Sequence, residues 1–431
     1  MIKNLQIYLQ KNNSLRKIII NISSLFSIQI LSYLLPLITT PYLNRVLGLE
    51  NIGILSFSAA FIGYFTILTE FGFNFTGIRL ISINKDFPEK VTEIFNSITV
   101  IKLFLFILSF ITICFLVYFI KMFKDYYLIY LYLAGTILAN ILMSNWFYQG
   151  MQEMKFLTIY TLISKSFYTI FIFFIVRSKN DFYNLSLLNF STSFLVGLYS
   201  YFYIKKKYSI KFYFPDFKIL KIYFLESVHI FLSNIFISIY TISTTFILGL
   251  FTDYKQVGIY SSADKIIQIF KSLTTPISES IYPEAAIRFK KNINYGLSFI
   301  YKASKAIIFV SLFTSLFSFI FAEKIILFLF GNEFIDSINI LKIMSFIPLY
   351  VSLSNICGIQ IMLNINLKKQ FTIIILIVSF VSITSNLIFV KLYKSLATAI
   401  IVQSSELLIF LVMLIFLYNY FYTKKRIKNV F

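Results

Sequence analysis

Long apolar segments alternate with short polar connections along the whole chain. About twelve of them approach the roughly 20 apolar residues that an α-helix needs to cross the hydrocarbon core of a bilayer. Residues 1–14 are polar and basic and lead directly into the first segment, so we expect no signal peptide. The pattern predicts an all-α polytopic membrane protein with spans at residues 15–35, 52–75, 94–120, 126–148, 156–176, 182–204, 222–250, 257–282, 303–322, 338–363, 371–390 and 395–420.

The two halves of the chain contain a repeat. With a shift of 205 residues, "TTPYLNRVLGLENIGILS" (39–56) aligns with "TTFILGLFTDYKQVGIYS" (244–261), and the identical positions include Gly53 and Gly258. Both segments follow the first span of a half. Because six spans are an even number, the halves have the same orientation, as in several transporter folds.

This repeat predicts two pseudo-symmetric six-helix bundles around a central cavity. We expect an N-terminal bundle at residues 1–204, a basic cytoplasmic linker at 205–221, and a C-terminal bundle with a basic tail at 222–431. No connection is long enough to hold a separate soluble domain.

Composition agrees with a membrane protein. Only 13% of the 431 residues are charged and 58% are hydrophobic, whereas soluble domains contain about 25% charged residues. The net charge of +21 is unevenly distributed, since the N-terminus, the even-numbered loops and the C-terminus contain 25 Lys and Arg residues and the odd-numbered loops contain 9, when Arg16, Lys17 and Lys305 at the ends of spans are counted with the adjacent connections. The positive-inside rule then places both termini in the cytoplasm. The basic charge suits membrane lipid headgroups, and we expect no nucleic-acid partner.

Residue types needed for metal or nucleotide chemistry are scarce. Cys114 and Cys357 lie in apolar sequence, and His229 is the single histidine. These residues predict neither a disulfide framework nor a Cys/His metal cluster. The sequence also has no G-x-x-x-x-G-K-[ST] phosphate loop. We therefore expect no cofactor, no ATP hydrolysis and no enzymatic activity.

One predicted span is unusually polar. Charge near the centre of a membrane helix costs roughly 2.5–3.5 kcal/mol per residue even on lenient scales. A polar stripe of this kind predicts the wall of a water-filled cavity, with Pro276 and Pro283 kinking or breaking the helix. At 100° per residue, one face of residues 257–282 contains Asp264, Gln268, Lys271, Thr275, Ser278, Glu279 and Tyr282, with Lys265 at its edge. A structural ion pair that involves Asp264 and Lys265 is the alternative.

Other spans contain shorter polar rows. Thr66, Glu70 and Asn74 recur at i, i+4 and i+8 on the second span, and Glu226 and His229 lie a turn apart at the start of the seventh. We consider Glu70, Asn74, Glu226 and His229 as cavity candidates, with an interfacial position as the alternative for the last two.

Isolated charges and polar residues also occur. Arg45 in the first outer loop is a further cavity candidate. Lys102 and Lys165 are expected to extend towards lipid headgroups. Glu406, in a late apolar helix, is expected to form an interhelical hydrogen bond.

Three stretches resemble the polysaccharide-repeat (O-antigen, Wzx-type) flippases of the multidrug/oligosaccharidyl-lipid/polysaccharide exporter superfamily. They are "PLITTPYLNRVLGLENIGILSFS", "NWFYQGMQEMKFLTI" (145–159), and "VGIYSSADKIIQI" (257–269) followed by "PISESIYP" (276–283). The resemblance implies a MATE-like fold whose cavity opens alternately to each side. It also implies undecaprenyl-pyrophosphate-linked oligosaccharide as the cargo, the bacterial inner membrane as the location, and polysaccharide polymerase and assembly proteins as partners.

The resemblance also assigns residues. Lys265 and Arg45 match basic positions of the related lipid II flippases, and both are therefore expected to contact the anionic headgroup. Lysine lacks the bidentate phosphate geometry of arginine.

Two other functions remain open at the level of sequence. A cation-coupled multidrug exporter of the same superfamily would use Asp264 and Glu70, although Lys265 and Lys271 disfavour cationic cargo. A membrane enzyme such as a polysaccharide polymerase usually needs a large outer loop, and the outer loops of this chain are short.

Overall fold

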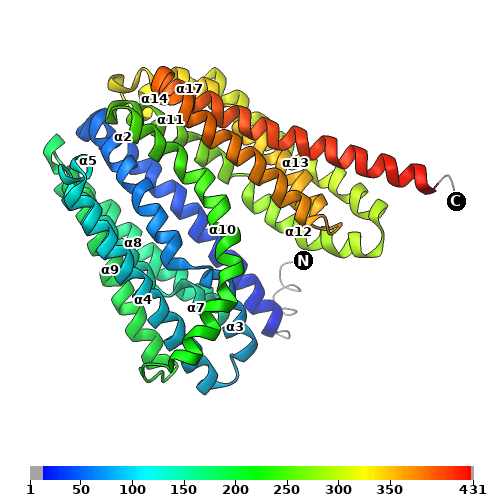
Figure 1. Ribbon diagram of the computed structural model, residues 1–431, viewed down its shortest axis with the longest axis horizontal. Helices are drawn as coiled ribbons and strands as arrows, with labels where there is room; N and C mark the ends of the chain where they lie inside the picture. Colours follow the sequence, from blue (N-terminus) through cyan, green and yellow to red (C-terminus); the bar gives the residue numbers. More distant parts are fainter. Residues whose placement is uncertain (1–12, 429–431) are drawn as a thin grey trace, which may run out of the picture. The chain divides into compact units, whose positions relative to one another are not determined.

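We describe the protein from a computed structural model (Figure 1). It describes residues 13–428, except for the side chains of residues 13–34, 37, 233, 234, 236–241 and 423–428. The described residues form helices joined by short turns and contain no β-strand. This confirms the all-α prediction.

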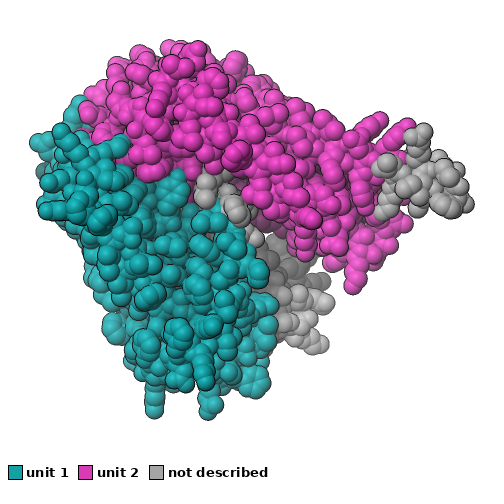
Figure 2. All heavy atoms as spheres, in the orientation of Figure 1, with its two compact units in different colours: residues 1–47, 58–238 teal, residues 48–57, 239–431 magenta. Residues whose placement is uncertain are grey.

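Contacts divide the chain into two compact units, which Figure 2 shows in different colours. Unit 1 comprises residues 1–47 and 58–238, and unit 2 comprises residues 48–57 and 239–431. The chain passes between them within two helices, α2 (Asn13–Glu70) and α10 (Phe217–Phe251). The role of residues 205–221 as a linker stays a prediction.

Unit 1 is built around an aromatic core. Phe95, Trp146 and Phe147 are almost completely buried and contact one another at ring-centroid distances of 5.2–6.0 Å. Edge-to-face and stacked rings at such distances contribute beyond their buried area. The helices of unit 1, besides parts of α2 and α10, are α3 (Phe73–Asn84), α4 (Pro88–Phe119), α5 (Lys121–Lys124), α6 (Tyr127–Met143), α7 (Asn145–Gly150), α8 (Met154–Ile175), η1 (Lys179–Asp181) and α9 (Phe182–Lys207).

Unit 2 has a smaller aliphatic core around Met362, Met413 and Leu417. One of its elements, η3, is a π-helix of seven residues. The elements of unit 2, besides parts of α2 and α10, are α11 (Tyr254–Ser272), α12 (Thr275–Lys291), α13 (Ile293–Ile320), α14 (Ala322–Leu329), η2 (Asn332–Phe334), α15 (Ser337–Met344), α16 (Ile347–Asn355), η3 (Ile356–Met362) and α17 (Lys368–Lys428).

Seven helical segments of the described residues are long and apolar enough to cross a membrane, which makes the chain a multi-span membrane protein. They cover eight of the twelve predicted spans, because Lys368–Tyr422 contains two. The predicted spans 182–204 and 257–282 correspond to helices with more polar residues. The span predicted at 222–250 lies in α10, several of whose side chains are outside the described part. The side chains of most of the span predicted at 15–35 lie outside the described part.

The predicted polar span 257–282 is two helices. α11 ends at Ser272, and α12 begins at Thr275 with Pro276 in its first turn. Proline has no backbone N–H, and the first turn of a helix is where that group needs no intrahelical partner. The expected break therefore occurs at Pro276, whereas Pro283 lies inside α12.

Two long helices of the structure bend at single residues with positive φ. In α2 (Asn13–Glu70) this residue is Gly48 (φ 78°), and in α17 it is Lys394 (φ 51°). The next backbone amide is in each case bonded by a side chain from another element of unit 2. Leu49 N–H donates to Glu333 (3.3 Å), and Ser395 N–H donates to Gln256 (3.4 Å). Side-chain acceptors at such positions replace the intrahelical carbonyls that a helix start lacks.

Candidate functional site

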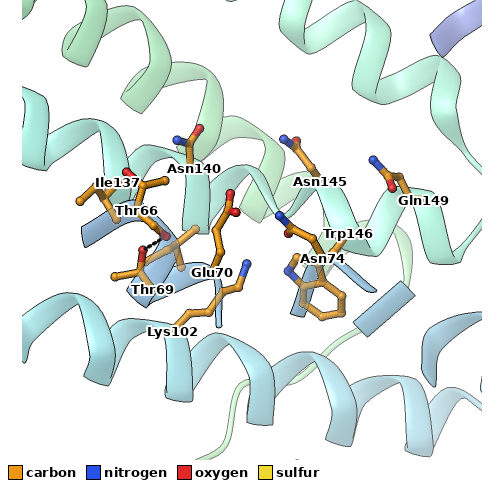
Figure 3. Close-up of a pocket in the computed structure, with 11 residues that line it drawn as sticks. Thr66, Thr69, Glu70, Asn74, Lys102, Ile137, Asn140, Asn145, Trp146 and Gln149 are labelled. Carbon is orange, nitrogen blue, oxygen red and sulfur yellow. Dashed lines mark hydrogen bonds between the residues drawn. The ribbon is translucent and has the colours of Figure 1, made fainter. Parts of the chain in front are cut away.

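The candidate site is a polar cavity of about 220 Å³ inside unit 1 (Figure 3). Five helices contribute to its wall. The residues that line it are Thr66, Thr69 and Glu70 of α2, Asn74 of α3, Lys102 of α4, Ile137, Asn140 and Ile141 of α6, and Asn145, Trp146 and Gln149 of α7. Most of these side chains are polar, although the helices that carry them are predominantly apolar.

Breaks in the helices bring these side chains into the wall. α2 ends at Glu70, and Phe71 (φ 44°) and Gly72 (φ 76°) turn the chain before Asn74. Ser144 (φ 50°) separates α6 from α7, which begins at Asn145. Such left-handed positions interrupt a helix without lengthening the loop. The chain can therefore place polar residues on the cavity wall without following one continuous helical stripe.

The absence of a side chain at Gly77 allows the indole ring of Trp146 to pack closely against α3. A Cβ on Gly77 would lie 2.7 Å from the indole ring of Trp146. The indole is 2% exposed and also stacks on Phe95 at 6.0 Å. Trp146 is thus held by its neighbours on α3 and α4 where it borders the cavity.

Lys102 is the cation of the cavity. Its side chain is 5% exposed, and in the part of the chain that the structure describes no hydrogen bond or ion pair reaches its ammonium group. Figure 3 shows it extending from α4 towards Glu70 and Asn74. A buried cation without a close partner is costly. Its presence at the wall of a polar cavity favours a role in binding.

The amide side chains supply further hydrogen-bonding groups. The Oδ1 atom of Asn145 is buried and accepts no hydrogen bond from the described residues. Asn74, Asn140 and Gln149 also line the cavity, and Thr69 uses its hydroxyl to donate to the Thr66 carbonyl at 2.9 Å. An amide can donate and accept at once, so this wall matches ligands that carry both kinds of group.

The structure brings only two of the predicted site residues into this cavity, Glu70 and Asn74. Elsewhere in unit 1, Glu226 of α10 forms an ion pair with Arg79 of α3. His229 is exposed one turn further along α10, and Arg45 is exposed on α2.

The remaining predicted residues belong to unit 2. Gln268 donates to Asp264 at 3.2 Å, and Lys265 is exposed. No ion pair joins Asp264 to Lys265 among the described side chains. The other members of the predicted stripe are separated by the turn at Leu273–Thr274. Lys271 precedes it on α11, and Thr275 and Glu279 follow it on α12.

Sequence reasoning missed part of the cavity. The prediction that Lys102 extends to the headgroups is wrong, since the side chain is buried and lines the cavity. Asn140 and Asn145 could have indicated the cavity, because polar amides inside a predicted membrane span need hydrogen-bond partners. Within the described residues, no group of three or more His, Cys, Asp and Glu side chains is arranged to hold a metal ion.

Sequence comparisons give consistent results. Residues 18–286 match the model of a family described as "Polysaccharide biosynthesis protein". A protein of Escherichia coli (strain K12) with the name "Putative O-antigen transporter" is 28% identical over 399 residues, which cover 93% of this chain and 96% of the relative. A protein of Shigella dysenteriae with the same name is 25% identical, over 91% of this chain and 98% of that relative.

Solved structures show the same fold. An inward-facing multidrug resistance MATE family transporter of the MOP superfamily superposes with a TM-score of 0.72 at 14% identity, covering 92% of this chain and 96% of that one. The lipid II flippase MurJ in an inward closed conformation gives 0.68 at 15% identity, over 93% and 87% of the two chains. These likenesses agree with the predicted layout of twelve helices in two bundles.

Proposed function

The chain belongs to the family of polysaccharide biosynthesis proteins, and on this premise we propose that it is a flippase. Its cargo is an undecaprenyl-pyrophosphate-linked oligosaccharide repeat unit of O-antigen, capsule or exopolysaccharide. The protein moves this cargo from the cytoplasmic to the outer leaflet of the plasma membrane by alternating access. The names of the two bacterial relatives support this assignment.

The single observation that carries the proposal is the composition of the cavity wall. Lys102, Glu70 and the surrounding amides form a polar site inside an apolar helical unit. Polar residues at membrane depth are costly and typically line substrate paths. Hydroxyl-rich sugars match amide and charged side chains, whereas the polyprenyl chain matches lipid.

The second part of the proposal concerns the anionic headgroup. Lys265 is exposed on α11, and the described residues place no carboxylate in an ion pair with it. A free ammonium group can form charge-assisted hydrogen bonds with phosphate. We assign pyrophosphate contact to Lys265, with Arg45 as a second cation, and both termini to the cytoplasm.

A transport assay in vesicles measures the proposed activity directly. The full-length protein is reconstituted in vesicles with a defined polyprenyl-pyrophosphate oligosaccharide on one leaflet, and exposure of the sugar on the other leaflet is followed with an impermeant lectin. We expect exposure to be faster than in protein-free vesicles and in vesicles with the Lys265→Ala variant. Equal rates in all three preparations would refute the flippase assignment.

A cargo control separates a flippase from a drug exporter. The same vesicles are loaded with a fluorescent lipophilic cation in the presence of a proton or sodium gradient. We expect no gradient-driven export of the dye. Export of the dye without movement of the lipid-linked sugar would instead establish the multidrug alternative.

A further inference from the structure

We propose that the cavity of unit 1 is a subsite for a single uncharged pyranose ring and that Lys102 and Glu70 together select against charged sugars. The proposal rests on the proposed function and specifies which class of sugar that function accepts at this place. The residues that form this subsite belong to α2, α3, α4, α6 and α7 of unit 1.

The size of the cavity limits the ligand. Its volume is about 220 Å³, below the roughly 300–1,000 Å³ of typical sites for drug-sized molecules. One sugar ring suits this volume better than a complete oligosaccharide repeat. The subsite therefore recognises one residue of the cargo.

The charges of the wall balance. Lys102 is its single cation and Glu70 its single anion among the lining residues. The two groups form no ion pair with each other in the described structure, although Lys102 experiences the field of the Glu70 carboxylate. A ligand carboxylate is repelled by Glu70 and a ligand ammonium group by Lys102. Either ligand also gives this enclosed and otherwise net-neutral site a net charge, which is costly to bury.

An uncharged polyol satisfies both groups at once. A sugar hydroxyl can accept a hydrogen bond from Lys102 and donate one to Glu70, because each hydroxyl is both donor and acceptor. The buried Asn145 Oδ1, which has no donor among the described residues, takes a further hydroxyl or an acetamido N–H.

The chain contains its own probe for this subsite. Trp146 is the single tryptophan of the sequence, and it lines the cavity. Excitation that avoids the tyrosines therefore reports on this cavity. A ligand beside the indole changes its surroundings and hence its emission.

The experiment is a fluorescence titration of the purified full-length protein in detergent. The probes are three methyl glycosides with the same ring, namely the neutral glucoside, the glucuronide and the protonated glucosaminide, together with methyl N-acetylglucosaminide. We expect the neutral glycosides to change Trp146 emission with dissociation constants about tenfold or more below those of the charged ones, as repulsion between like charges predicts.

Two variants make the charge argument specific. Glu70→Gln should improve binding of the glucuronide relative to the neutral glucoside, and Lys102→Met should improve binding of the glucosaminide. A merely structural role for either residue would not produce these opposite shifts. Lys165→Met, on α8 outside the cavity, is the matched lysine control and should keep the selectivity of the original protein.

A third variant covers the case in which a charge variant fails to fold. Asn145→Ala should weaken all glycosides without changing their order, with folding checked by elution as a monodisperse peak. The proposal is overturned if no glycoside changes the emission of folded protein, if the glucuronide binds most tightly, or if folded charge variants keep the original selectivity. Transport of lipid-linked oligosaccharide in vesicles is measured separately, so a flippase without this subsite would still be recognised.

Discussion

Gly53 and Gly258 each accommodate a backbone carbonyl of the other's segment. A Cβ on Gly53 would lie 1.8 Å from the oxygen of Tyr254, and a Cβ on Gly258 would lie 2.3 Å from the oxygen of Leu49. With the 205-residue shift, Gly53 corresponds to Gly258 and Leu49 to Tyr254. The two copies of the repeat therefore cross in a reciprocal contact within unit 2.

Alanine at either glycine should destabilise the protein. Backbone oxygens at such distances cannot move as a side-chain tip can, and overpacking typically costs about 1–3 kcal/mol or more. We expect Gly53→Ala and Gly258→Ala to lower the midpoint of thermal unfolding in detergent. Gly135→Ala is the control, because its Cβ would meet the movable ring of Phe190. Equal stability of all three variants would contradict the reciprocal crossing.

Glycine at Lys394 should stabilise the protein. This residue has φ 51° and ψ −133°, which side chains disfavour at a cost of about 1–3 kcal/mol. The added chain entropy of glycine offsets roughly 0.5–1 kcal/mol. We expect Lys394→Gly to raise the unfolding midpoint, whereas Leu392→Gly, inside regular helix, should lower it. A lower midpoint for Lys394→Gly would show that the bend at this residue is not strained.

Replacement of Lys265 should affect transport more than folding. The side chain is exposed, so Lys265→Ala should remain in the membrane at normal abundance. Loss of one charge-assisted contact, about 1.5–3 kcal/mol, should lower transport about tenfold or more, and Lys265→Arg should retain activity. Comparable losses with Ala and Arg would favour a structural role.

The double variant Asp264→Asn with Lys265→Gln tests the ion-pair alternative. Asp264 accepts from Gln268, and the described side chains form no pair between Asp264 and Lys265. We therefore expect Asp264→Asn to fold and to transport slowly, and the double variant to transport more slowly still. Recovery of transport in the double variant would establish the pair.

The turn before α9 should depend on pH. The Ser178 hydroxyl and the backbone amides of Arg177 and Ser178 donate to Asp181 and hold the pKa of its carboxyl below the usual 3.8. A depressed pKa in the folded state stabilises the turn above pH 3.8, and this effect is lost as the pH falls through the folded pKa. Amide exchange at Ser178, corrected for intrinsic rates, should accelerate in that range. In the Asp181→Asn variant, the Ser178 amide should be less protected from exchange, and its protection should not change with pH in this range. The same pH profile in the variant and in the original protein would contradict the role of the Asp181 carboxylate.

Orientation can be measured by cysteine labelling. In a background without Cys114 and Cys357, we introduce a cysteine at Lys211 or at Lys255. The positive-inside rule places residue 211 in the cytoplasm and residue 255 outside. An impermeant reagent applied to spheroplasts should then label only position 255. Labelling of 211 alone would reverse the topology.

The sequence predicted the positions of the helices better than the contacts between them. Pro276 correctly indicated the break between α11 and α12, because a missing N–H has local consequences. Repeat identity at Gly53 and Gly258 indicated equivalent folds, but identity carries no information that the equivalent segments touch. Their contact depends on packing between distant parts of the chain.

The candidate cavity was predicted only in part for a similar reason. Glu70 and Asn74 were recognised because their spacing in the sequence matches one helical face, although the turn at Phe71 and Gly72 places them on different helices. Lys102 was assigned to the lipid surface, since its own helix does not reveal which side chains face it. Asn145 and Gln149 lie beyond the left-handed Ser144, where a continuous helical projection fails.

The π-helix η3 in unit 2 contains one residue more than an α-helix would need for the same turn. Its Gln360 donates to the carbonyl and hydroxyl of Ser278, both at 3.0 Å, and so ties this stretch to α12. Conversion of its i→i+5 bonds to the i→i+4 bonds of an α-helix would displace the following residues by one position, a rotation of roughly 100°. Gln360 would then leave Ser278, so a local change of winding in one helix would remove these two hydrogen bonds, while the bond that the Ser278 hydroxyl donates to Asn355, the residue before η3, would remain.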